Sequence, residues 1–457
     1  MRTVLVNSPV EVVREKGYDT PDYPNPSLAP LATYLRHSGE ECAVVDAKLE
    51  GLLLDSVLAR IQALSPDFVG FTAFTHEISH VAEIARRVRH LVPGATTIIG
   101  GAHATALPER TLEEFPVFDV AVFGEGEVTL LQLVSRHRPL ESIKGLAWRK
   151  DGAIIRNEPR PFIENLDDLP DTDWSLFPKA RIYPIFTSRG CPFNCVFCSR
   201  PFGRKLRTRS PQRILGEMGG IIQDFGVRSF LFWDEAFGLD VKKTDALLDG
   251  LISEPRFSPI TWNCQTNVNV LSPSLIGKMK AAGCGNIGIG VESGDEDILS
   301  HMGKGVTLPR IVAAANSLRA AGMPFSAFFI LGHPNETVKT INSTINFAVK
   351  LNPNCPVFGI MVPYPGTEIY RMAQSGEGGY LLLSRDWGDF NKQMGKALEL
   401  KGVSRRTLEL MQVKAYFSVF LRNGRFRDLL RYAVQYRREF WSLVVNFIGR
   451  RRVDRMA

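Results

Sequence analysis

The sequence predicts an α/β protein built on two parallel sheets, and three observations support this fold class. Short apolar runs of strand length alternate with segments of helical periodicity through residues 1–138, and again through residues 181–375. The chain of 457 residues is longer than one ordinary domain. Its content of 44% hydrophobic and 23% charged residues is typical of a packed globular protein and excludes disorder and collagen-like repeats.

Residues 1–138 are predicted to form a doubly wound parallel sheet. The segment from Ser79 has apolar residues at helical spacing, including Val81, Val88 and Leu91, before Pro93-Gly94 ends it. In such sheets, ligands bind at the carboxyl ends of the strands. The candidate strands begin at Val4, Cys42, Asp67, Thr96 and Phe118, and the loops after them contain Thr72, Gly100, Gly101, His103 and the run Gly124 to Glu127.

Residues 139–180 are predicted to form a hairpin and a linker. GLAWRK and AIIRN flank Asp151-Gly152, and this dipeptide tolerates the positive φ values of a type I′ turn. The next stretch, PFIENLDDLPDTDWSLFP, is rich in proline and acidic residues, which is typical of a linker.

Residues 181–375 are predicted to contain six β/α units. Such units form either an open parallel sheet or a partial (β/α)6 barrel, and in both cases catalytic residues are expected at the carboxyl ends of the strands. The candidate strands begin at Ile182, Arg228, Ile260, Asn286, Phe325 and Val357.

Residues 376–457 are predicted to form a helical, basic C-terminal region. From Lys401 onward there are 14 Lys and Arg against 4 Asp and Glu, whereas the preceding residues hold 41 against 44. The positive charge therefore belongs to the tail, and a basic catalytic surface for nucleic acid is not supported. An apolar stripe from Phe426 through Phe440 to Ile448, interrupted by Arg437, either caps the core or contacts an anionic membrane surface.

The strongest chemical signal is the run Cys191-Pro-Phe-Asn-Cys195-Val-Phe-Cys198, just after the first strand of the second body. Three thiolates on one loop can hold an iron–sulfur cluster and leave one iron open for another ligand. The alternative is a zinc knuckle with a distant fourth ligand, although no matching CxxC or HxxxH pair occurs elsewhere. An odd cysteine count with this spacing favours the reducing cytoplasm. The single cysteines at 264, 284 and 355 are expected to be buried as small apolar residues.

The CxxxCxFC run at the end of the first strand of a six-unit β/α body resembles the radical S-adenosylmethionine superfamily. The resemblance implies that a 4Fe-4S cluster on Cys191, Cys195 and Cys198 binds S-adenosylmethionine through its open iron. One-electron cleavage then releases a 5′-deoxyadenosyl radical, which abstracts hydrogen from an unactivated carbon. An external electron donor such as flavodoxin or ferredoxin is implied as well.

Later segments extend the resemblance residue by residue. Phe197 corresponds to an aromatic residue that lies near the adenine, and Asp234 with Glu235 to the motif that holds the methionine amino group. Glu292 and Ser293 correspond to the strand that contacts the ribose and the carboxylate. Asn267 marks a departure, because many relatives have an arginine near this position.

The domain order resembles the cobalamin-binding subfamily, in which a doubly wound domain with GGAHATALPE and FGEGE precedes the radical core. The DxHxxG motif that supplies an axial histidine in other cobalamin enzymes is absent, so no ligation through such a histidine is expected. The alternative is a scaffold that binds no cofactor. By this resemblance the cobalamin loops comprise Thr72, Gly100, Gly101, His103, Thr105, Gly124, Glu125 and Gly126.

The resemblance implies methyl transfer from cobalamin to an unactivated carbon of a small-molecule or lipid-like substrate. The cysteine usage and the basic tail predict a location in the cytoplasm or at the inner face of the membrane. A close alternative is oxidative cyclisation or ring rearrangement of a tetrapyrrole or terpenoid lipid without methyl transfer. A methylthiotransferase acting on transfer RNA is disfavoured, because the N-terminal domain contains only Cys42. A non-catalytic cobalamin sensor is disfavoured by the intact cysteine triplet.

Overall fold

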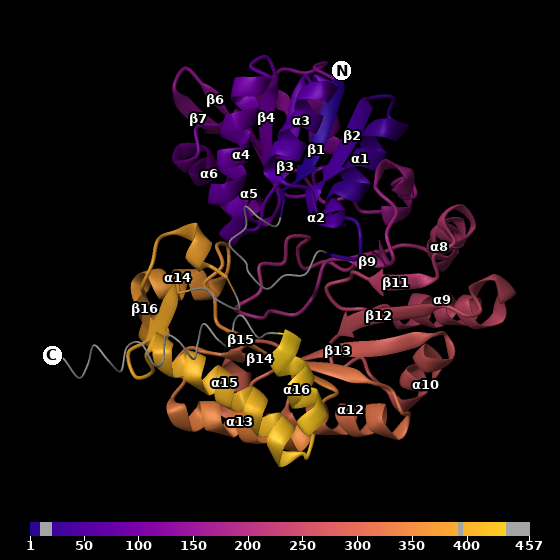
Figure 1. The fold of residues 1–457 in the computed structure, drawn as a ribbon, viewed down its shortest axis with the longest axis vertical. Coiled ribbons are helices and arrows are strands. Elements are labelled where there is room, and N and C mark those ends of the chain that lie inside the picture. The colour runs from indigo at the N-terminus through magenta and orange to yellow at the C-terminus, as the bar shows by residue number, and fades with distance from the viewer. Residues whose placement is uncertain (10–20, 392–395, 436–457) are drawn as a thin grey trace.

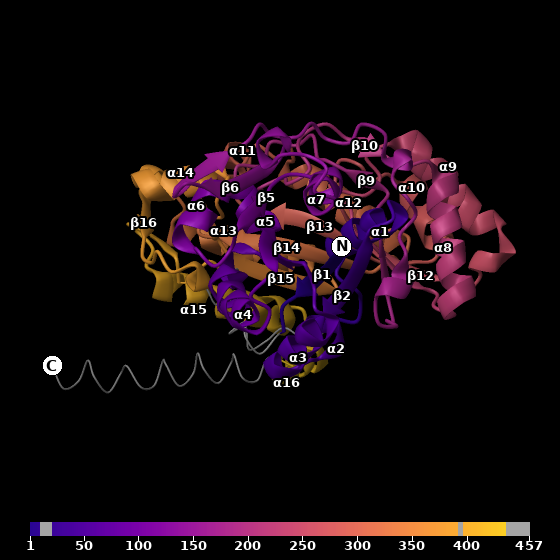
Figure 2. The ribbon, with the colours of Figure 1, turned by 90° about the horizontal axis from the view of Figure 1, so that it is seen from above.

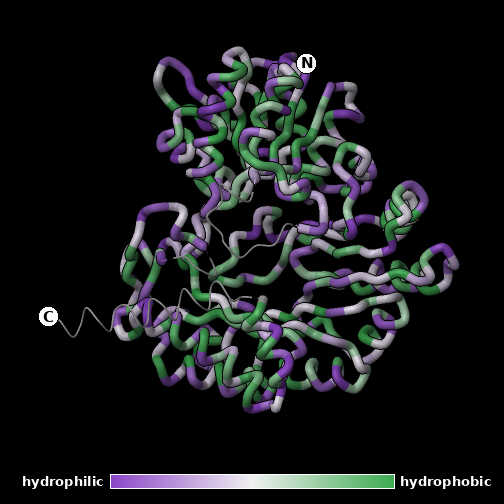
Figure 3. Tube along the Cα trace, in the orientation of Figure 1, coloured by the Kyte–Doolittle hydropathy of each residue, from purple (hydrophilic) through white to green (hydrophobic). Residues whose placement is uncertain are grey.

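The computed structural model describes residues 1–9, 21–391 and 396–435, whose backbone forms two large parallel sheets. Figure 1 shows the N-terminal sheet above the second sheet, with the C-terminal helices beneath. Hydrophobic residues concentrate along the strands, and hydrophilic residues lie on the outer helices and loops (Figure 3). This arrangement confirms the predicted α/β class.

The N-terminal sheet has the strand order β2-β1-β3-β4-β5-β6-β7. Its first five strands are parallel, in an order also found in flavodoxin-like folds. These strands are β1 (Arg2–Asn7), β2 (Glu41–Asp46), β3 (Phe68–Thr72), β4 (Thr96–Gly100) and β5 (Val120–Val122).

Helices cover both faces of this sheet, which confirms the doubly wound prediction. α1 (Leu28–His37) and α7 (Glu127–Val134) pack together on one face, and α3 (Leu54–Leu64) and α4 (Ile78–Leu91) pack together on the other. The apolar face predicted for α4 is buried, except that Leu91 is 39% exposed at the last turn. The shorter helices are α2 (Ala47–Glu50), α5 (Ala102–Ala106) and α6 (Pro108–Glu114).

The predicted hairpin is formed by β6 (Leu146–Lys150) and β7 (Ala153–Arg156). Asp151 and Gly152 have φ values of 49° and 83°, as a type I′ turn requires. β6 pairs antiparallel with β5, so the hairpin extends the N-terminal sheet. The acidic segment that follows buries Trp174 in the main core, so it is packed rather than loose.

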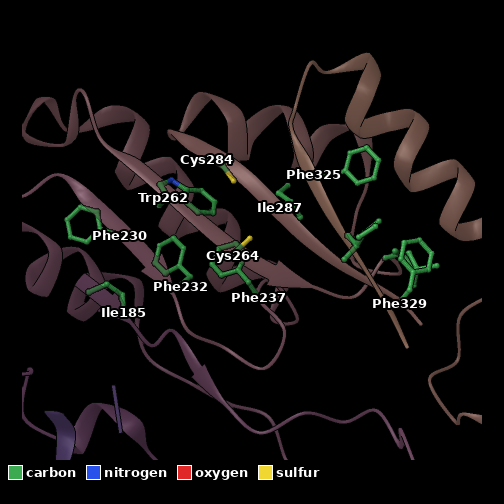
Figure 4. Packing of buried hydrophobic residues seen from close by; sticks show 14 of the residues in the cluster. Ile185, Phe230, Phe232, Phe237, Trp262, Cys264, Cys284, Ile287, Phe325 and Phe329 are labelled. Atoms are coloured by element: carbon green, nitrogen blue, oxygen red, sulfur yellow. The ribbon is translucent and has the colours of Figure 1, made fainter. Parts of the chain in front are cut away.

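The second sheet contains six parallel strands in the order β15-β14-β13-β12-β11-β8, as successive β/α units require. β8 and β15 are its edge strands, so the sheet is open, like an incomplete barrel. Phe230, Trp262, Ile287 and Phe325 contribute to its core (Figure 4). The strands are β8 (Tyr183–Ile185), β11 (Ser229–Phe232), β12 (Thr261–Thr266), β13 (Cys284–Glu292), β14 (Phe325–Leu331) and β15 (Cys355–Ile360).

Side-chain caps begin several of the intervening helices. Ser272, Thr307 and Thr337 each accept a hydrogen bond from the backbone amide three residues later, which satisfies an otherwise free donor of the first turn. The helices are α8 (Pro211–Phe225), α9 (Val241–Ser253), α10 (Pro273–Ala281), α11 (Glu296–His301), α12 (Leu308–Ala320), α13 (Val338–Leu351) and α14 (Glu368–Ser375).

The single cysteines of this sheet differ in burial. Cys264 and Cys284 are buried, as predicted, but Cys355 is exposed, so that prediction was wrong. Cys355 is the first residue of edge strand β15, which has a neighbouring strand on one side only.

The C-terminal region contains α15 (Arg405–Arg422) and α16 (Phe426–Gln435). It also contains a short antiparallel pair, β16 (Tyr380–Leu382) and β17 (Leu398–Leu400), which the helical prediction missed because three-residue strands carry no periodicity. Figure 2 shows α15 along the side of the molecule near β15.

α15 covers the β15 edge of the second sheet. Tyr416 Oη accepts a hydrogen bond from the Phe358 amide (3.0 Å), and Gln412 Nε2 donates to the Phe358 carbonyl (2.6 Å). A helix that satisfies an edge strand in this way prevents pairing with other chains. The predicted apolar stripe beyond residue 435 lies outside the described residues, and no helix within the described ranges is long and apolar enough to cross a membrane.

Candidate active site

The three clustered cysteines lie on a loop that follows β8, at the carboxyl end of the second sheet. A two-strand ladder closes the base of this loop, where β9 (Ser188–Arg189) pairs antiparallel with β10 (Arg207–Thr208). Within the loop, the Cys191 amide donates to the Gly203 carbonyl at 3.1 Å. All three cysteines are partly exposed, and none forms a disulfide.

The protonation of these thiols depends on burial. Burial raises the pKa of Cys195 to about 11, against the opposing charge of Lys304, and it raises the pKa of Cys191 as well. Metal binding would therefore release protons. Among the described residues, no three His, Cys, Asp or Glu side chains are spaced to hold a single metal ion. A cluster that takes each thiolate on a different iron does not need that spacing.

Gly190 and Glu235 shape the entry to the cysteine loop. Gly190 has φ +92°, and a Cβ there would lie 2.2 Å from the Lys205 carbonyl oxygen, so a larger residue does not fit. Its amide donates to Glu235 Oε2 at 3.2 Å. Glu235 Oε1 is buried without a hydrogen-bond partner in the described part of the chain, and burial raises the pKa of this carboxyl. Such an acceptor suits an ammonium group of a ligand.

Two of the residues predicted to contact the ligand make hydrogen bonds within the protein. Asp234 accepts hydrogen bonds from Thr187 N (2.8 Å), Thr187 Oγ1 (2.5 Å) and Ser188 N (2.8 Å). Burial raises its pKa to about 6, although these hydrogen bonds oppose the shift. Ser293 is fully buried, with its hydroxyl 3.0 Å from Thr344 Oγ1. Asp234 therefore holds the backbone that leads into the cysteine loop, and Ser293 joins β13 to α13.

Glu292 forms a buried ion pair that sequence reasoning did not predict. It has φ +66° and pairs with Lys304, whose Nζ also donates to the Gly290 carbonyl at 2.7 Å. Beside Lys304, the Met302 carbonyl accepts from the amide of Val196 in the cysteine loop at 3.1 Å. The only sequence signal for this cation was a lysine flanked by two glycines.

Phe197 contacts the loop after β14. Its ring lies 6.4 Å from that of His333, which is fully buried, and burial lowers the pKa of His333 to about 4. Glu336 accepts hydrogen bonds from the amides of Gly332 and His333, which fixes the loop. The site therefore includes a neutral imidazole beside the predicted adenine-contacting ring.

The second group of predicted residues lies at the carboxyl edge of the N-terminal sheet. Thr72 ends β3, Gly100 ends β4, and Thr105 Oγ1 accepts a hydrogen bond from Gly124 N at 3.3 Å. Among the residues that the structure describes, none comes within 4 Å of a Cβ built on Gly124. Phe74 is 57% exposed just after β3. Phe74 and Gly124 both follow strands of the N-terminal sheet, at its carboxyl edge.

Gly101 and His103 lie in a closely packed part of this edge of the sheet. Gly101 has φ +91°, and a Cβ there would lie 2.7 Å from Thr72 Oγ1. His103 is 1% exposed, so it is not a surface residue, and burial lowers its pKa to about 4. Both ring nitrogens lack a hydrogen-bond partner within the described ranges. The ring meets the edge of Trp387 at 4.8 Å, a contact from the C-terminal region that the sequence did not indicate.

Glu125, which was also predicted to belong to the cobalamin loops, forms ion pairs within the protein. Its side chain is 2% exposed and pairs with Arg189 and Arg207, so its carboxylate faces protein. Gly126 directly precedes α7. Because Arg189 lies two residues before Cys191, this contact brings the carboxyl edges of the two sheets together (Figure 1).

Family models match both halves of the chain. Residues 185–348 match the radical SAM superfamily, and residues 18–134 match the B12 binding domain. The chain is 32% identical to an uncharacterized methyltransferase of Pyrococcus horikoshii over 434 residues, which cover 92% of this chain and 93% of that protein. It is 29% identical to the anaerobic magnesium-protoporphyrin IX monomethyl ester cyclase of Cereibacter sphaeroides over 345 residues, covering 72% of this chain and 56% of the cyclase.

The fold is also similar to that of a solved protein. The radical S-adenosylmethionine methyltransferase TsrM of Kitasatospora setae, solved with cobalamin and a 4Fe-4S cluster bound, superposes with a TM-score of 0.71 at 19% identity. The match covers 86% of this chain and 82% of TsrM. The arrangement of both sheets is therefore shared with that structure.

Proposed function

The chain belongs to the cobalamin-dependent radical S-adenosylmethionine methyltransferase family, and we propose that it methylates an unactivated carbon of a small-molecule substrate. The cofactors of this family are a 4Fe-4S cluster, S-adenosylmethionine and cobalamin. When bound, they supply hydrogen-atom abstraction and a transferable methyl group, while the protein supplies orientation and exclusion of water.

On the side of the second sheet, Cys191, Cys195 and Cys198 would hold the cluster. Glu235 Oε1 has no donor within the described ranges, and this supports a role in binding the methionine ammonium group, because a buried acceptor without a donor is costly. Phe197 would lie near the adenine ring. Asp234 would act on ligand binding only through the backbone that it holds.

At the carboxyl edge of the N-terminal sheet, His103 has no hydrogen-bond partner and Gly124 no neighbour for a Cβ among the described residues, which supports cobalamin binding there. His103 would donate to or accept from a polar group of the cofactor, and its low pKa keeps it neutral at pH 7. Phe74 would lose exposed apolar surface against the ring. Thr105 would keep its present task of holding the Gly124 loop.

The observation that carries the proposal is the direct contact between the two edges. Glu125 follows β5 of the first sheet, and Arg189, its partner at 3.0 Å, lies two residues before Cys191. The residues proposed for the two cofactors therefore flank one site, and a substrate between them would be within reach of both.

Anaerobic reconstitution with iron and sulfide, followed by S-adenosylmethionine labelled on its methyl group and a strong reductant, tests the proposal. We expect bound iron and 5′-deoxyadenosine from the wild type and from Cys355→Ser, a matched control at an exposed cysteine of β15. Cys195→Ser should yield neither. Zinc in place of iron, or no iron after careful reconstitution, would refute the class, and a cobalt absorption spectrum tests the N-terminal domain.

Oxidative cyclisation without methyl transfer is the alternative, favoured by the 29% identity to the cyclase. We propose tetrapyrroles and terpenoid lipids as the substrates to test first, with flavodoxin or ferredoxin as electron donor. A labelled methyl group in the product supports methyl transfer. A product that gains no label and loses hydrogen supports cyclisation.

The exposed face of α16 supports peripheral contact with an anionic membrane. Phe426, Leu430 and Val434 are 65%, 67% and 56% exposed and lie four residues apart, on one side of the helix. Arg427 and Arg431 are exposed beside them. Apolar side chains next to arginines suit a surface of acidic lipid headgroups.

Co-sedimentation with vesicles tests this contact. We expect binding to phosphatidylglycerol vesicles, weaker binding to phosphatidylcholine vesicles, and loss of binding in Leu430→Asp. Leu410→Asp, at a residue of α15 that is 46% exposed, is the matched control and should bind normally. Equal binding to both lipids, or normal binding by Leu430→Asp, would contradict the proposal.

A further inference from the structure

A buried cluster of two carboxylates and two guanidinium groups joins the two edges of the site. Glu125 Oε1 lies 3.0 Å from Arg189 Nη1 and 2.9 Å from Arg207 Nη1. Glu127 Oε1 lies 2.6 Å from Arg189 Nη2. Each of the four side chains is at most 5% exposed, so the cluster is neutral overall and almost closed to water.

The two arginines stand at the base of the cysteine loop. Arg189 and Arg207 are register partners in the β9–β10 ladder, and the chain between them carries all three clustered cysteines. Glu125 lies on the loop after β5 and Glu127 is the first residue of α7. This loop is tied to α5 by the hydrogen bond from Gly124 N to Thr105 Oγ1. The cluster therefore connects the cysteine loop directly to the loop proposed for cobalamin.

The guanidinium groups of this Glu–Arg cluster are held in defined orientations. The guanidinium groups of Arg189 and Arg207 lie over the rings of Phe202 and Phe162, at 5.1 and 4.8 Å, so their edges remain free for carboxylates. Buried ion pairs contribute little net stability, because desolvation offsets most of the Coulomb attraction. A planar guanidinium group nevertheless admits few placements of a carboxylate. This group of two glutamates and two arginines is therefore better suited to fixing the distance between the two loops than to stabilising their association.

We propose that Glu125, Glu127, Arg189 and Arg207 are positioning residues. They hold the cysteine loop and the loop after β5, which is proposed to bind cobalamin, at one fixed distance from each other. The inference rests on the proposed function, and it identifies the contact that fixes the distance between the two cofactors. In a variant with a loosened contact, cleavage of S-adenosylmethionine should continue while the yield of methylated product per cleavage falls.

Glu127→Gln tests this role in the full-length, reconstituted protein. It keeps the size of the side chain but removes one of the two carboxylate charges that pair with Arg189. Glu164→Gln is the matched control, because its partner Lys205 lies on the cysteine loop and both side chains are more than half exposed. Iron and cobalamin content should match the wild type in both variants.

The first readout is backbone hydrogen exchange, measured with and without the cofactors. In Glu127→Gln, we expect residues 120–134 and 186–208 to exchange faster together, on the order of ten-fold, which corresponds to about 1.4 kcal/mol. Glu164→Gln should leave both segments unchanged. Faster exchange confined to the segment that contains residue 127 would overturn the proposal.

The second readout is the distribution of distances between the reduced 4Fe-4S cluster and the cobalt(II) of cobalamin, measured by pulsed electron spin resonance. Glu127→Gln should broaden this distribution, whereas a purely stabilising role would leave its width unchanged, and an unchanged width would refute the positioning role. Failure of the wild type to bind cobalamin would instead refute the proposed function, an outcome distinct from one-sided hydrogen exchange.

Discussion

Replacing Glu336 with glutamine should remove a pH dependence that this carboxyl confers on stability. Glu336 is 3% exposed, and burial raises its pKa from 4.5 to about 7, while the amides of Gly332 and His333 donate to it and oppose the shift. A folded pKa above the unfolded value means that the folded state binds the proton more tightly. The resulting stability is fully present below about pH 4.5 and is lost as the pH rises through about 7.

The size of the effect follows from the shift. Moving the pKa from 4.5 to about 7 corresponds to about 3 kcal/mol, at about 1.4 kcal/mol per pKa unit. Glutamine resembles the protonated carboxyl, because it keeps an acceptor for both amides and carries no charge. Glu336→Gln should therefore match the wild type within about 1 kcal/mol at pH 5 and exceed its stability by about 3 kcal/mol at pH 8.

Denaturant unfolding of the cofactor-free chain at pH 5 and pH 8, under reducing conditions, measures this difference. Glu368→Gln is the control, because Glu368 is an exposed carboxylate on α14. It should gain no stability at pH 8. Parallel pH profiles for wild type and Glu336→Gln would refute the reasoning, since they would mean that Glu336 is ionised in the folded state across this range.

Three further substitutions test individual contacts of the site. Gly190→Ala should lower the iron bound per chain after reconstitution, because its Cβ would lie 2.2 Å from the facing carbonyl oxygen of the loop; an unchanged iron content would contradict this. Lys304→Met should destabilise the protein by about 3–5 kcal/mol in denaturant unfolding, because it leaves Glu292 buried and unpaired. Adding Glu292→Gln should recover much of this loss. Trp387→Phe should cost about 1.5–3 kcal/mol in the same assay, because the indole no longer donates to Glu114; a loss near zero would mean that water replaces the contact.

Much of the fold could be predicted because its signals are local. The alternation of strand and helix patterns depends on side chains a few residues apart, and the Asp151-Gly152 hairpin depends on the φ preferences of two residues. The cysteine triplet is contiguous, and strand order alone brings Thr72, Gly100 and Gly124 to one edge of the N-terminal sheet. The prediction of the cysteine site and the prediction of the N-terminal sheet edge did not require knowledge of contacts between distant segments.

The roles of individual polar side chains could not be predicted in the same way. Asp234 is satisfied by donors 46 and 47 residues away, and Glu125 is paired with an arginine 64 residues away. His103 is buried partly by Trp387 of the C-terminal region, and Cys355 is exposed because its strand lies at an edge.

The sequence by itself therefore determined the order of the elements and the residues that arrive at the carboxyl edges of the two sheets. Only the tertiary structure decided whether a given carboxylate or imidazole at those edges meets protein or remains available to a ligand. The physical reason is that periodicity and turn preference are short-range properties of the backbone. The desolvation and pairing of a buried polar group depend instead on whatever distant segments pack against it.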